Sequence, residues 1–307
     1  PDIIHVHKLR GLSTAIWEAA RSVGIDRIVQ TCQDYELLSP EGSLNSCVGQ
    51  WSNSGRYWMQ PYSKCRAWFS RVVRHATSPS EYVLNKLRKH GFFSRANKSI
   101  IRNSHGIKLD QLKVIRSIAL PSKFIDKNSS TNPINVLFLG RIEKNKGIDW
   151  FCDFFARHSR RWPNFRLNIA GWGSLEQTLR KKYGQYSQIV FHGALFGDRK
   201  HQLLQRSHVM VVPSVYEEIS PVVISEAYAY GIPVIGSRIG GIPELIQDGV
   251  TGWLANPLAE DAWIDIFDTI FQETDFLKEM SYKCADVSHG FSPEKITADY
   301  LRVYEQL

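Results

Sequence analysis

The stretch at residues 213–254, PSVYEEISPVVISEAYAYGIPVIGSRIGGIPELIQDGVTGWL, constrains the fold of this chain most strongly. It follows an apolar, β-branched run at 209–212, which has the length and composition of a buried parallel strand. Pro221 suits the first turn of a helix, and Gly231 suits the position just after its end. A second strand is expected at 234–236. The pattern therefore predicts a strand–helix–strand unit of a parallel α/β sheet.

Two glutamates lie near the start of this helix. Glu218 falls in the loop before the helix and Glu226 falls inside it, with seven residues between them. The two carboxylates can therefore converge on a ligand that lies across the helix N-terminus. Taken alone, Glu226 is more simply an acid that interacts with its own helix N-terminus, and Glu218 is a solvated loop carboxylate.

The motifs around the two glutamates favour the ligand. Five short patterns occur in order, Glu-x7-Glu, Glu-Ala, Gly-x-Pro-Val-Ile, Gly-Gly-x-x-Glu and Asp-Gly-x-x-Gly, beginning at Glu218, Glu226, Gly231, Gly240 and Asp248. Together they resemble the signature of the retaining glycosyltransferases of group 1, also called family 4, which have the two-domain GT-B fold. The resemblance implies transfer of a sugar from a nucleotide-diphosphate sugar to an acceptor, with retention of configuration.

The same resemblance implies an α/β fold with two Rossmann-like domains, the second built on a parallel, doubly wound sheet. A polar, turn-rich segment at 126–133 separates regions of different charge, and we place the domain boundary there. The expected parts are a partial N-terminal acceptor-side domain at 1–130, a C-terminal nucleotide-sugar-binding domain at 131–290, and a C-terminal helix at 291–307 that packs back toward the first domain.

The first domain is expected to be truncated. The chain opens directly on an interior strand at 3–6, and a helix at 12–23 and a strand at 27–31 complete a βαβ unit. In the resembled family, earlier strands and a glycine-rich loop come before this segment. Since each βα step takes about 30 residues, roughly half of that domain would be missing. After the βα steps, residues 41–60 have the Gly, Ser and Asn content of a long loop.

A second motif suits a diphosphate. The buried strand expected at 134–139 leads into Gly-Arg-x4-Lys-Gly at 140–147. Arg141 and Lys146 would stand at the mouth of that strand with a helix N-terminus just behind them, an arrangement that binds phosphates. The simpler alternative is that both are surface charges on a turn, which is how we interpret Lys144.

The resemblance assigns roles to these residues. Arg141, Lys146 and Glu218 are the expected catalytic residues, since the two cations stabilise the leaving diphosphate and the carboxylate faces the sugar and its oxocarbenium-like centre. Glu226 is expected to bind the ribose hydroxyls. The other expected donor-binding positions are Gly140, Gly171, Gly193, Leu195, Ser220, Pro221, Val222 and Val223. Close strand–helix packing explains Gly171 equally well.

We expect no metal ion and no cofactor beyond the nucleotide-sugar substrate. Two fixed cations would already neutralise the diphosphate, and the sequence has no Asp-x-Asp motif.

On the acceptor side we expect His7 and Gln33. The sequence reads Thr-Cys-Gln-Asp-Tyr at 31–35, where the resembled family has His at the third position. Gln33 can hydrogen-bond a sugar hydroxyl but cannot carry a proton as imidazole does, so acid–base help from this position is either unnecessary or lost. His5 and His7 alternate onto one side of a strand, which leaves open an acceptor contact, a metal site or ordinary packing.

Composition fits a cytoplasmic protein. The 307 residues are 43% hydrophobic, yet no apolar run approaches the ~20 residues of a membrane helix, and the first residues lack a signal-peptide pattern. Five cysteines without a Cys-x-x-Cys pair indicate reduced thiols.

The net charge of +8 is concentrated in one block. Residues 64–116 hold thirteen Lys or Arg against only Glu81 and Asp110, a local charge of +11. The block favours an anionic partner such as the inner face of a membrane, to which the protein would bind peripherally. A solubilising helix face explains it equally well. No nucleic-acid motif accompanies it, so we expect no nucleic-acid partner.

The implied function is a glycosyltransferase of the hexosyltransferase type that acts on a saccharide or lipid-linked saccharide in cell-surface polysaccharide or lipopolysaccharide synthesis. The alternative is a catalytically impaired nucleotide-sugar-binding module, which Gln33 favours.

Overall fold

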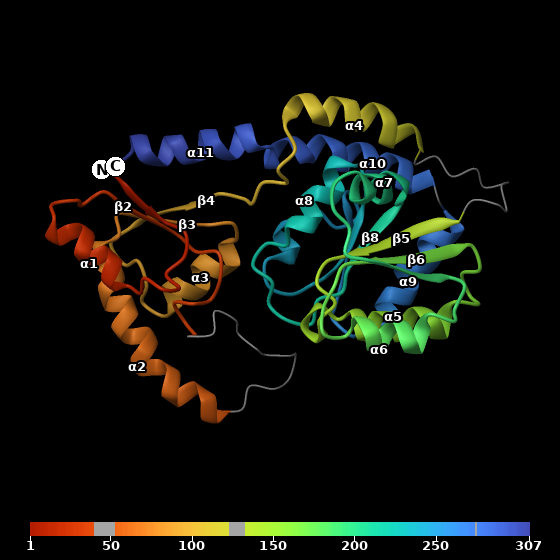
Figure 1. Ribbon diagram of the computed structural model, residues 1–307, viewed down its shortest axis with the longest axis horizontal. Helices are drawn as coiled ribbons and strands as arrows, with labels where there is room; N and C mark the ends of the chain where they lie inside the picture. Colours follow the sequence, from red (N-terminus) through yellow and green to blue (C-terminus); the bar gives the residue numbers. More distant parts are fainter. Residues whose placement is uncertain (40–52, 123–132, 274) are drawn as a thin grey trace. The chain divides into compact units, whose positions relative to one another are not determined.

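The computed structural model of the chain describes residues 1–39, 53–122, 133–273 and 275–307. It divides into two compact units, coloured along the chain in Figure 1. Unit 1 comprises Pro1–Asn103, Tyr216–Ser220 and Glu294–Leu307, and unit 2 comprises Ser104–Val215 and Pro221–Pro293.

Unit 1 is built on a four-stranded parallel sheet in the order β1-β2-β3-β4. Its strands are β1 (Ile4–Val6), β2 (Ile28–Thr31), β3 (His75–Ser78) and β4 (Asn97–Ile100). Its helices are α1 (Ala15–Ser22), α2 (Asn53–Phe69), the short η1 (Ser70–Val72), α3 (Glu81–Lys89) and α11 (Pro293–Glu305).

Apolar residues spaced along the helices form the core of unit 1. In α3, Val83, Leu84 and Leu87 are buried on one face, and the Ser80 hydroxyl caps the helix by accepting from the Val83 amide at 3.4 Å. The helix α11 packs on the sheet through Val303, which is buried against Val29 and Ile101.

The helix α2 begins at Asn53, within the loop expected at 41–60. The residues that suggested a loop fall in its first turn, Asn53, Ser54 and Gly55, where such residues are well tolerated. The rest of the expected loop, 41–52, lies outside the described residues.

Unit 2 is built on a six-stranded parallel sheet in the order β10-β9-β8-β5-β6-β7. Its strands β5, β6 and β8 are labelled in Figure 1. Its strands are β5 (Ile134–Leu139), β6 (Phe165–Ala170), β7 (Ile189–Gly193), β8 (Val209–Val212), β9 (Val234–Ser237) and β10 (Gly252–Ala255). Its helices are α4 (Leu109–Ser122), α5 (Ile148–His158), α6 (Glu176–Tyr183), α7 (Gly197–Arg206), α8 (Val222–Ala229), α9 (Glu260–Gln272) and α10 (Asp275–Ser288), with the short turns η2 (Lys144–Lys146), η3 (Ile242–Glu244) and η4 (His289–Phe291).

The core of unit 2 is rich in aromatic side chains. Trp162 and Phe267 are fully buried with ring centroids 4.9 Å apart, and Phe154 packs against both. These rings join α5 to α9 beside the strands β5 and β6. The core therefore fixes the sheet whose strand ends carry the candidate site.

The boundary between the units lies at Asn103 and Ser104, whereas the sequence suggests about residue 130. The reason is α4, whose Leu112 and Ala119 are buried in the core of unit 2 with Ile224. A division of the chain by charge therefore differs from a division by packing, because the first half of α4 still lies in the basic block at 64–116. The linker expected at 126–133 lies, except for Pro133, outside the described residues.

No helix in the described ranges is both long enough and apolar enough to cross a membrane.

Candidate functional site

The chain changes direction across the sheet of unit 2 between β5 and β8. From β5 it runs outward through β6 and β7, and it then returns to β8 on the other side of β5 before continuing to β9 and β10. In open parallel sheets, ligands bind at the carboxyl ends of the strands where the loops diverge at such a point. The loops after β5 and β8 therefore define the candidate ligand site of unit 2.

The loops after β5 and β8 are locked together by a glycine. Gly147 has φ of 68°, and a Cβ at this position would lie 1.9 Å from the Pro213 carbonyl oxygen. The Val215 amide donates to the Asn145 carbonyl at 3.0 Å. Only glycine combines this left-handed conformation with so close an approach, which explains the glycine at the end of the Gly-Arg-x4-Lys-Gly motif.

The loops after β5 and β6 are also in backbone contact. A Cβ on Gly171 would lie 1.7 Å from the Gly140 carbonyl oxygen, and the Ile142 amide donates to the Trp172 carbonyl at 2.8 Å. The close contact of Gly171 is with the backbone of Gly140 in the neighbouring loop, and not with a helix as the packing alternative expected. A role for Gly140 and Gly171 in donor binding stays a prediction.

A carboxylate that sequence reasoning did not single out adds to this contact. Glu143 accepts hydrogen bonds from the Ser174 amide at 3.0 Å and from the Ser174 hydroxyl at 2.6 Å. These two bonds lower the pKa of the Glu143 carboxyl. Glu143 thus cross-links the loops after β5 and β6, and no motif in the sequence signals this pairing.

Arg141 and Lys146 lie in the same loop, as the motif predicts. Arg141 is exposed just beyond β5, and Lys146 is half-buried at the end of η2, where its amide donates to the Glu143 carbonyl at 3.0 Å. The helix α5 starts directly afterwards. Lys144 is exposed in the same turn. The structure therefore places two cations on a loop that Gly147 and Glu143 hold against its neighbours.

The loop after β8 leads into the N-terminus of α8. Pro221 has a non-helical ψ of 112° and precedes the helix, which begins at Val222, one residue later than the sequence suggests. The first turn contains no acidic residue, and Val222 is 39% exposed. Amide groups in a first helical turn have no partner within their helix, so this end can bind an anion.

Glu226 lies in α8 and is paired with a residue of α7. Its Oε1 is 2.7 Å from Nζ of Lys200. Burial and then the charge of Glu226 raise the pKa of the neighbouring Tyr230 to about 12. The sequence missed Lys200, because the contact depends on how α7 packs beside α8. Glu226 thus lies beyond the first turn of α8 and has a cationic partner from another helix.

Gly193 is the last residue of the edge strand β7, and Leu195 follows two positions later. Gly193 has φ of 69°, and its carbonyl accepts from the Gly171 amide at 2.8 Å. Leu195 is partly buried against the apolar core beside β8. Both residues thus lie at the carboxyl ends of the strands, in the row of loops that holds Gly140 and Gly171.

The segment that carries Glu218 belongs to unit 1. Glu218 is 5% exposed, and the Tyr216 hydroxyl donates to its Oε2 at 2.8 Å. The neighbouring Glu217 forms an ion pair with Lys86, and the Ser220 carbonyl accepts from the Asn103 side chain at 3.2 Å. The solvated loop carboxylate considered for Glu218 is therefore wrong, because the side chain is buried and hydrogen-bonded.

The two histidines of β1 form a network inside unit 1. His5 is hydrogen-bonded to the Tyr304 hydroxyl at 2.6 Å and to the Thr31 hydroxyl at 2.7 Å. Burial and then the charge of His7 lower the pKa of His5 to about 4. The ring of the exposed His7 lies 4.0 Å from that of His5. Packing therefore accounts for His5. Across the described ranges, no group of three or more His, Cys, Asp or Glu is placed to hold a metal ion.

A pocket of about 570 Å³ lies in unit 1 and is lined by residues that include Arg10, Asp34, Glu36 and Arg66. The Glu36 carboxylate accepts from the Leu9 amide at 2.7 Å, and burial raises its pKa. Gln33 is exposed beside the lining residue Asp34. The pocket therefore follows the carboxyl ends of β1 and β2, and the sequence had indicated only Gln33 and His7 there.

The segment of the chain that matches a known protein family lies mostly in unit 2. Residues 133–273 match the family described as glycosyl transferases group 1. This segment, most of which belongs to unit 2, is therefore similar to glycosyltransferase group 1 domains. An uncharacterized glycosyltransferase of Methanocaldococcus jannaschii is 30% identical over 174 residues, which are 55% of this chain and 44% of that protein. An uncharacterized protein from the cps region of Klebsiella pneumoniae is 25% identical over 245 residues, 80% of this chain and 59% of that protein. The matches thus span about half the length of these relatives.

Solved structures resemble the whole chain. HepE of Anabaena, solved in complex with UDP, matches with a TM-score of 0.73 at 18% identity and covers 100% of this chain and 79% of its own. The same protein in complex with UDP-glucose matches with a TM-score of 0.71. The predicted α/β fold with parallel sheets, of the GT-B type, is confirmed.

The matched segment, residues 133–273, includes every residue that we expected at the donor side, from Gly140 to Glu226. His7 and Gln33 lie outside it. The unit boundary crosses the matched segment, because Glu218 and Ser220 pack with unit 1 while Pro221 and Glu226 pack with unit 2.

Proposed function

We propose that this chain is a retaining glycosyltransferase of the hexosyltransferase type. It transfers a sugar from a nucleotide-diphosphate sugar to a saccharide or a lipid-linked saccharide. The observation that carries the proposal is the loop of Arg141 and Lys146 at the switch point of unit 2, locked to the loop that leads into α8. The match of residues 133–273 to the group 1 glycosyltransferases supports it.

The first group of residues binds the diphosphate that leaves when the sugar is transferred. Arg141 and Lys146 stabilise the negative charge that develops as the bond to the sugar breaks. The amides at the start of α8, at Val222 and Val223, add partial positive charge, and Ser220 and Pro221 shape the approach to them. Fixed cations and dipoles need no reorganisation during the reaction, and they make a metal ion unnecessary for charge neutralisation.

The remaining donor groups are recognised by carboxylates and loop backbone. Glu226, oriented by Lys200, binds the ribose hydroxyls. Gly193 and Leu195 border the base, and Gly140 and Gly171 allow the backbone to approach the donor. Glu218 binds the sugar and stabilises positive charge at its anomeric carbon, as carboxylates do in other glycoside reactions. The Tyr216 hydroxyl holds this carboxylate in place.

The acceptor side rests on unit 1. His7 and Gln33 contact the acceptor beside the pocket that contains Asp34 and Glu36. We propose a cytoplasmic enzyme that attaches peripherally to the inner face of a membrane through its basic block, and that has no nucleic-acid partner. A role in cell-surface polysaccharide or lipopolysaccharide synthesis is supported by the relative from the Klebsiella cps region.

The test is release of nucleotide diphosphate from a panel of nucleotide sugars by the purified chain, with and without saccharide acceptors. We expect release from at least one donor, unchanged by a metal chelator, and a product with the donor's anomeric configuration by NMR. Binding without release from any donor would contradict the transfer activity.

Gln33 favours a second candidate, a nucleotide-sugar-binding module with impaired transfer. Gln33 is exposed next to the acceptor-side pocket and cannot carry a proton. The variant Gln33→His separates the candidates, because it would raise the rate of sugar transfer at least about tenfold if a missing acid–base group limits the chain. An active parent that is unaffected by Gln33→His would exclude the impaired module.

A further inference from the structure

A second pocket in unit 1, of about 370 Å³, is lined by none of the residues that the proposed function assigns to the donor or the acceptor, although its Arg71, Arg74 and Arg95 belong to the basic block. Its lining includes Ile28 at the start of β2, Arg74 just before β3 and Arg95 two residues before β4. Because the sheet is parallel, the amino-terminal ends of these strands lie at the same end of the sheet. His7 and Gln33 follow the carboxyl ends of β1 and β2, at the opposite end of the sheet. The pocket is therefore separate from the acceptor side.

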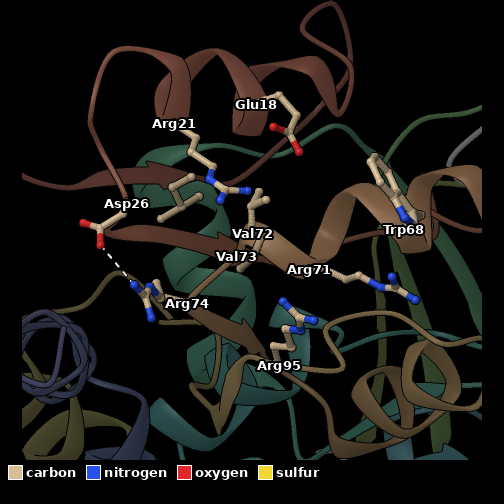
Figure 2. A pocket seen from close by; sticks show the side chains of 10 residues that line it. Glu18, Arg21, Asp26, Trp68, Arg71, Val72, Val73, Arg74 and Arg95 are labelled. Atoms are coloured by element: carbon tan, nitrogen blue, oxygen red, sulfur yellow. Dashed lines mark hydrogen bonds and ion pairs between the residues drawn. The ribbon is translucent and has the colours of Figure 1, made fainter.

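Arginine side chains dominate this second pocket. Figure 2 shows four of them around it, together with two carboxylates and one indole: Arg21, Arg71, Arg74, Arg95, Glu18, Asp26 and Trp68. Asp26 pairs with Arg74, with Oδ2 3.0 Å from Nη2. Arg21, Arg71 and Arg95 form no ion pair within the described part of the chain. The pocket thus has an excess of guanidinium groups that face solvent.

An excess of guanidinium groups in a concave site selects for phosphate. Like charges held close together repel, and an anion bound between them relieves the repulsion. The planar guanidinium presents two parallel donors that match two phosphate oxygens, which a compact ammonium does not do. Arg71 and Arg95 are both exposed, so their side chains can reach a ligand without disturbing the core.

The size and lining of the pocket indicate more than a bare phosphate ion. A volume of about 370 Å³ is in the range of small-molecule sites. Val72 and Val73 line it beside the arginines, and the Trp68 indole is 57% exposed. An exposed indole next to apolar side chains provides a contact surface for the organic part of a ligand.

We propose that this pocket binds the phosphate group of a phosphorylated ligand, with Arg71 and Arg95 on the phosphate oxygens and Trp68 on the attached group. The same phosphomonoester chemistry occurs in a soluble phosphate ester and in the headgroup of an anionic lipid. The proposal does not depend on sugar transfer, because none of these residues belongs to the proposed donor or acceptor site.

The test compares two double variants of the whole chain. Arg71→Gln/Arg95→Gln removes two pocket cations, while Arg88→Gln/Lys89→Gln removes two exposed cations of α3 that lie outside the pocket. The probes are glycerol 3-phosphate, measured by calorimetry, and phosphatidylcholine vesicles with and without phosphatidic acid, measured by sedimentation. The variant Arg71→Lys/Arg95→Lys keeps the charge and loses the guanidinium forks.

The pocket variant should lose at least about tenfold in affinity for one probe, whereas the control should lose less than about twofold for glycerol 3-phosphate and clearly less than the pocket variant for phosphatidic acid vesicles. The lysine variant should be intermediate. Loss confined to glycerol 3-phosphate identifies a soluble ester, and loss confined to phosphatidic acid vesicles identifies a lipid headgroup. If the parent binds neither probe, or if the pocket variant binds both like the parent, the phosphate pocket is wrong. Equal loss in both double variants would also overturn it, because it would show unspecific charge attraction.

Discussion

The ammonium group of Lys200 lies 2.7 Å from the carboxylate of Glu226, so that a residue of α7 holds a residue of α8 that we assign to the donor ribose. The Lys200 and Glu226 side chains are 28% and 17% exposed. The pair is therefore partly screened by solvent, and its contribution to ligand binding comes from orienting the Glu226 carboxylate.

Lys200→Met should weaken binding of a nucleoside diphosphate by up to about fivefold, since partly exposed ion pairs contribute up to about 1 kcal/mol. Affinity for inorganic pyrophosphate, which has no ribose, should not change. Calorimetry measures both. Lys181→Met, an exposed position of α6, is the matched control and should bind both ligands like the parent. A parallel loss of pyrophosphate affinity in Lys200→Met would show that the pair does not act through the ribose.

Gly171→Ala should lower the free energy of unfolding by about 1–3 kcal/mol, because its Cβ would lie 1.7 Å from the Gly140 carbonyl oxygen and force the two loops apart. Thermal unfolding measures the change. Gly290→Ala is the control, since no atom lies within 4 Å of a Cβ there. Equal melting temperatures of the two variants would show that the loops after β5 and β6 are not in close contact.

The strands of unit 2 could be predicted closely from the sequence. The runs expected at 134–139 and 209–212 match β5 and β8, because a strand buried on both faces is a continuous apolar run between turn residues. The edge strand β10 was not predicted, since its four residues open with Gly252 and contain no β-branched residue. Residues 109–122, which form α4, fell within the first domain expected at 1–130, because the boundary was placed at a polar segment, whereas their packing places them in unit 2.

The motif residues were easier to predict than their partners. Arg141, Lys146 and the glycine that follows them belong to one short motif, Gly-Arg-x4-Lys-Gly, which can be recognised in the sequence. Lys200 and Glu143 carry no such mark, because their contacts arise only when α7 meets α8 and when the loop after β6 meets the loop after β5. A side chain that orients a site residue from another helix or loop can be identified only from the tertiary structure.

Stability of unit 2 should depend on pH through Glu260 of α9. Its carboxylate accepts from Arg157, with Nη2 to Oε2 at 2.9 Å, and these bonds, followed by that of His158, lower its pKa from 4.5 to about 2. A carboxyl whose pKa is lowered by folding stabilises the native state fully above its unfolded pKa, and this contribution is lost as the pH falls through the folded pKa.

Glu260→Gln should therefore reduce the free energy of unfolding at pH 7 by about 0.2–1 kcal/mol, the range for exposed pairs. The difference from the parent should shrink below pH 4.5 and vanish near pH 2. Urea unfolding across this pH range measures it. Glu279→Gln, whose side chain has no ion pair in the described ranges, should behave like the parent. A difference that stays constant down to pH 2 would contradict the assigned pKa shift.

Glu218→Gln should lose most of the turnover and leave affinity for the nucleoside diphosphate nearly unchanged, since we assign this carboxylate to the sugar and its developing positive charge. Turnover by release of nucleotide diphosphate and affinity by calorimetry separate the two effects. Tyr216→Phe removes the hydroxyl that donates to Glu218 and should give a smaller loss in the same direction. Equal loss of diphosphate affinity in Glu218→Gln would contradict this role.

The most direct test of the whole account is the affinity of Arg141 and Lys146 variants for a nucleoside diphosphate, measured by calorimetry. Charge-assisted hydrogen bonds contribute roughly 1.5 to 3 kcal/mol each, so Arg141→Ala or Lys146→Ala should weaken binding by about tenfold to over a hundredfold. Affinity for the bare nucleoside should hardly change, and Lys144→Ala, an exposed residue of the same turn, should bind like the parent. If both cation variants bind the diphosphate as tightly as the parent, or if a chelator abolishes binding by the parent, the metal-free diphosphate site at the loop after β5 is wrong.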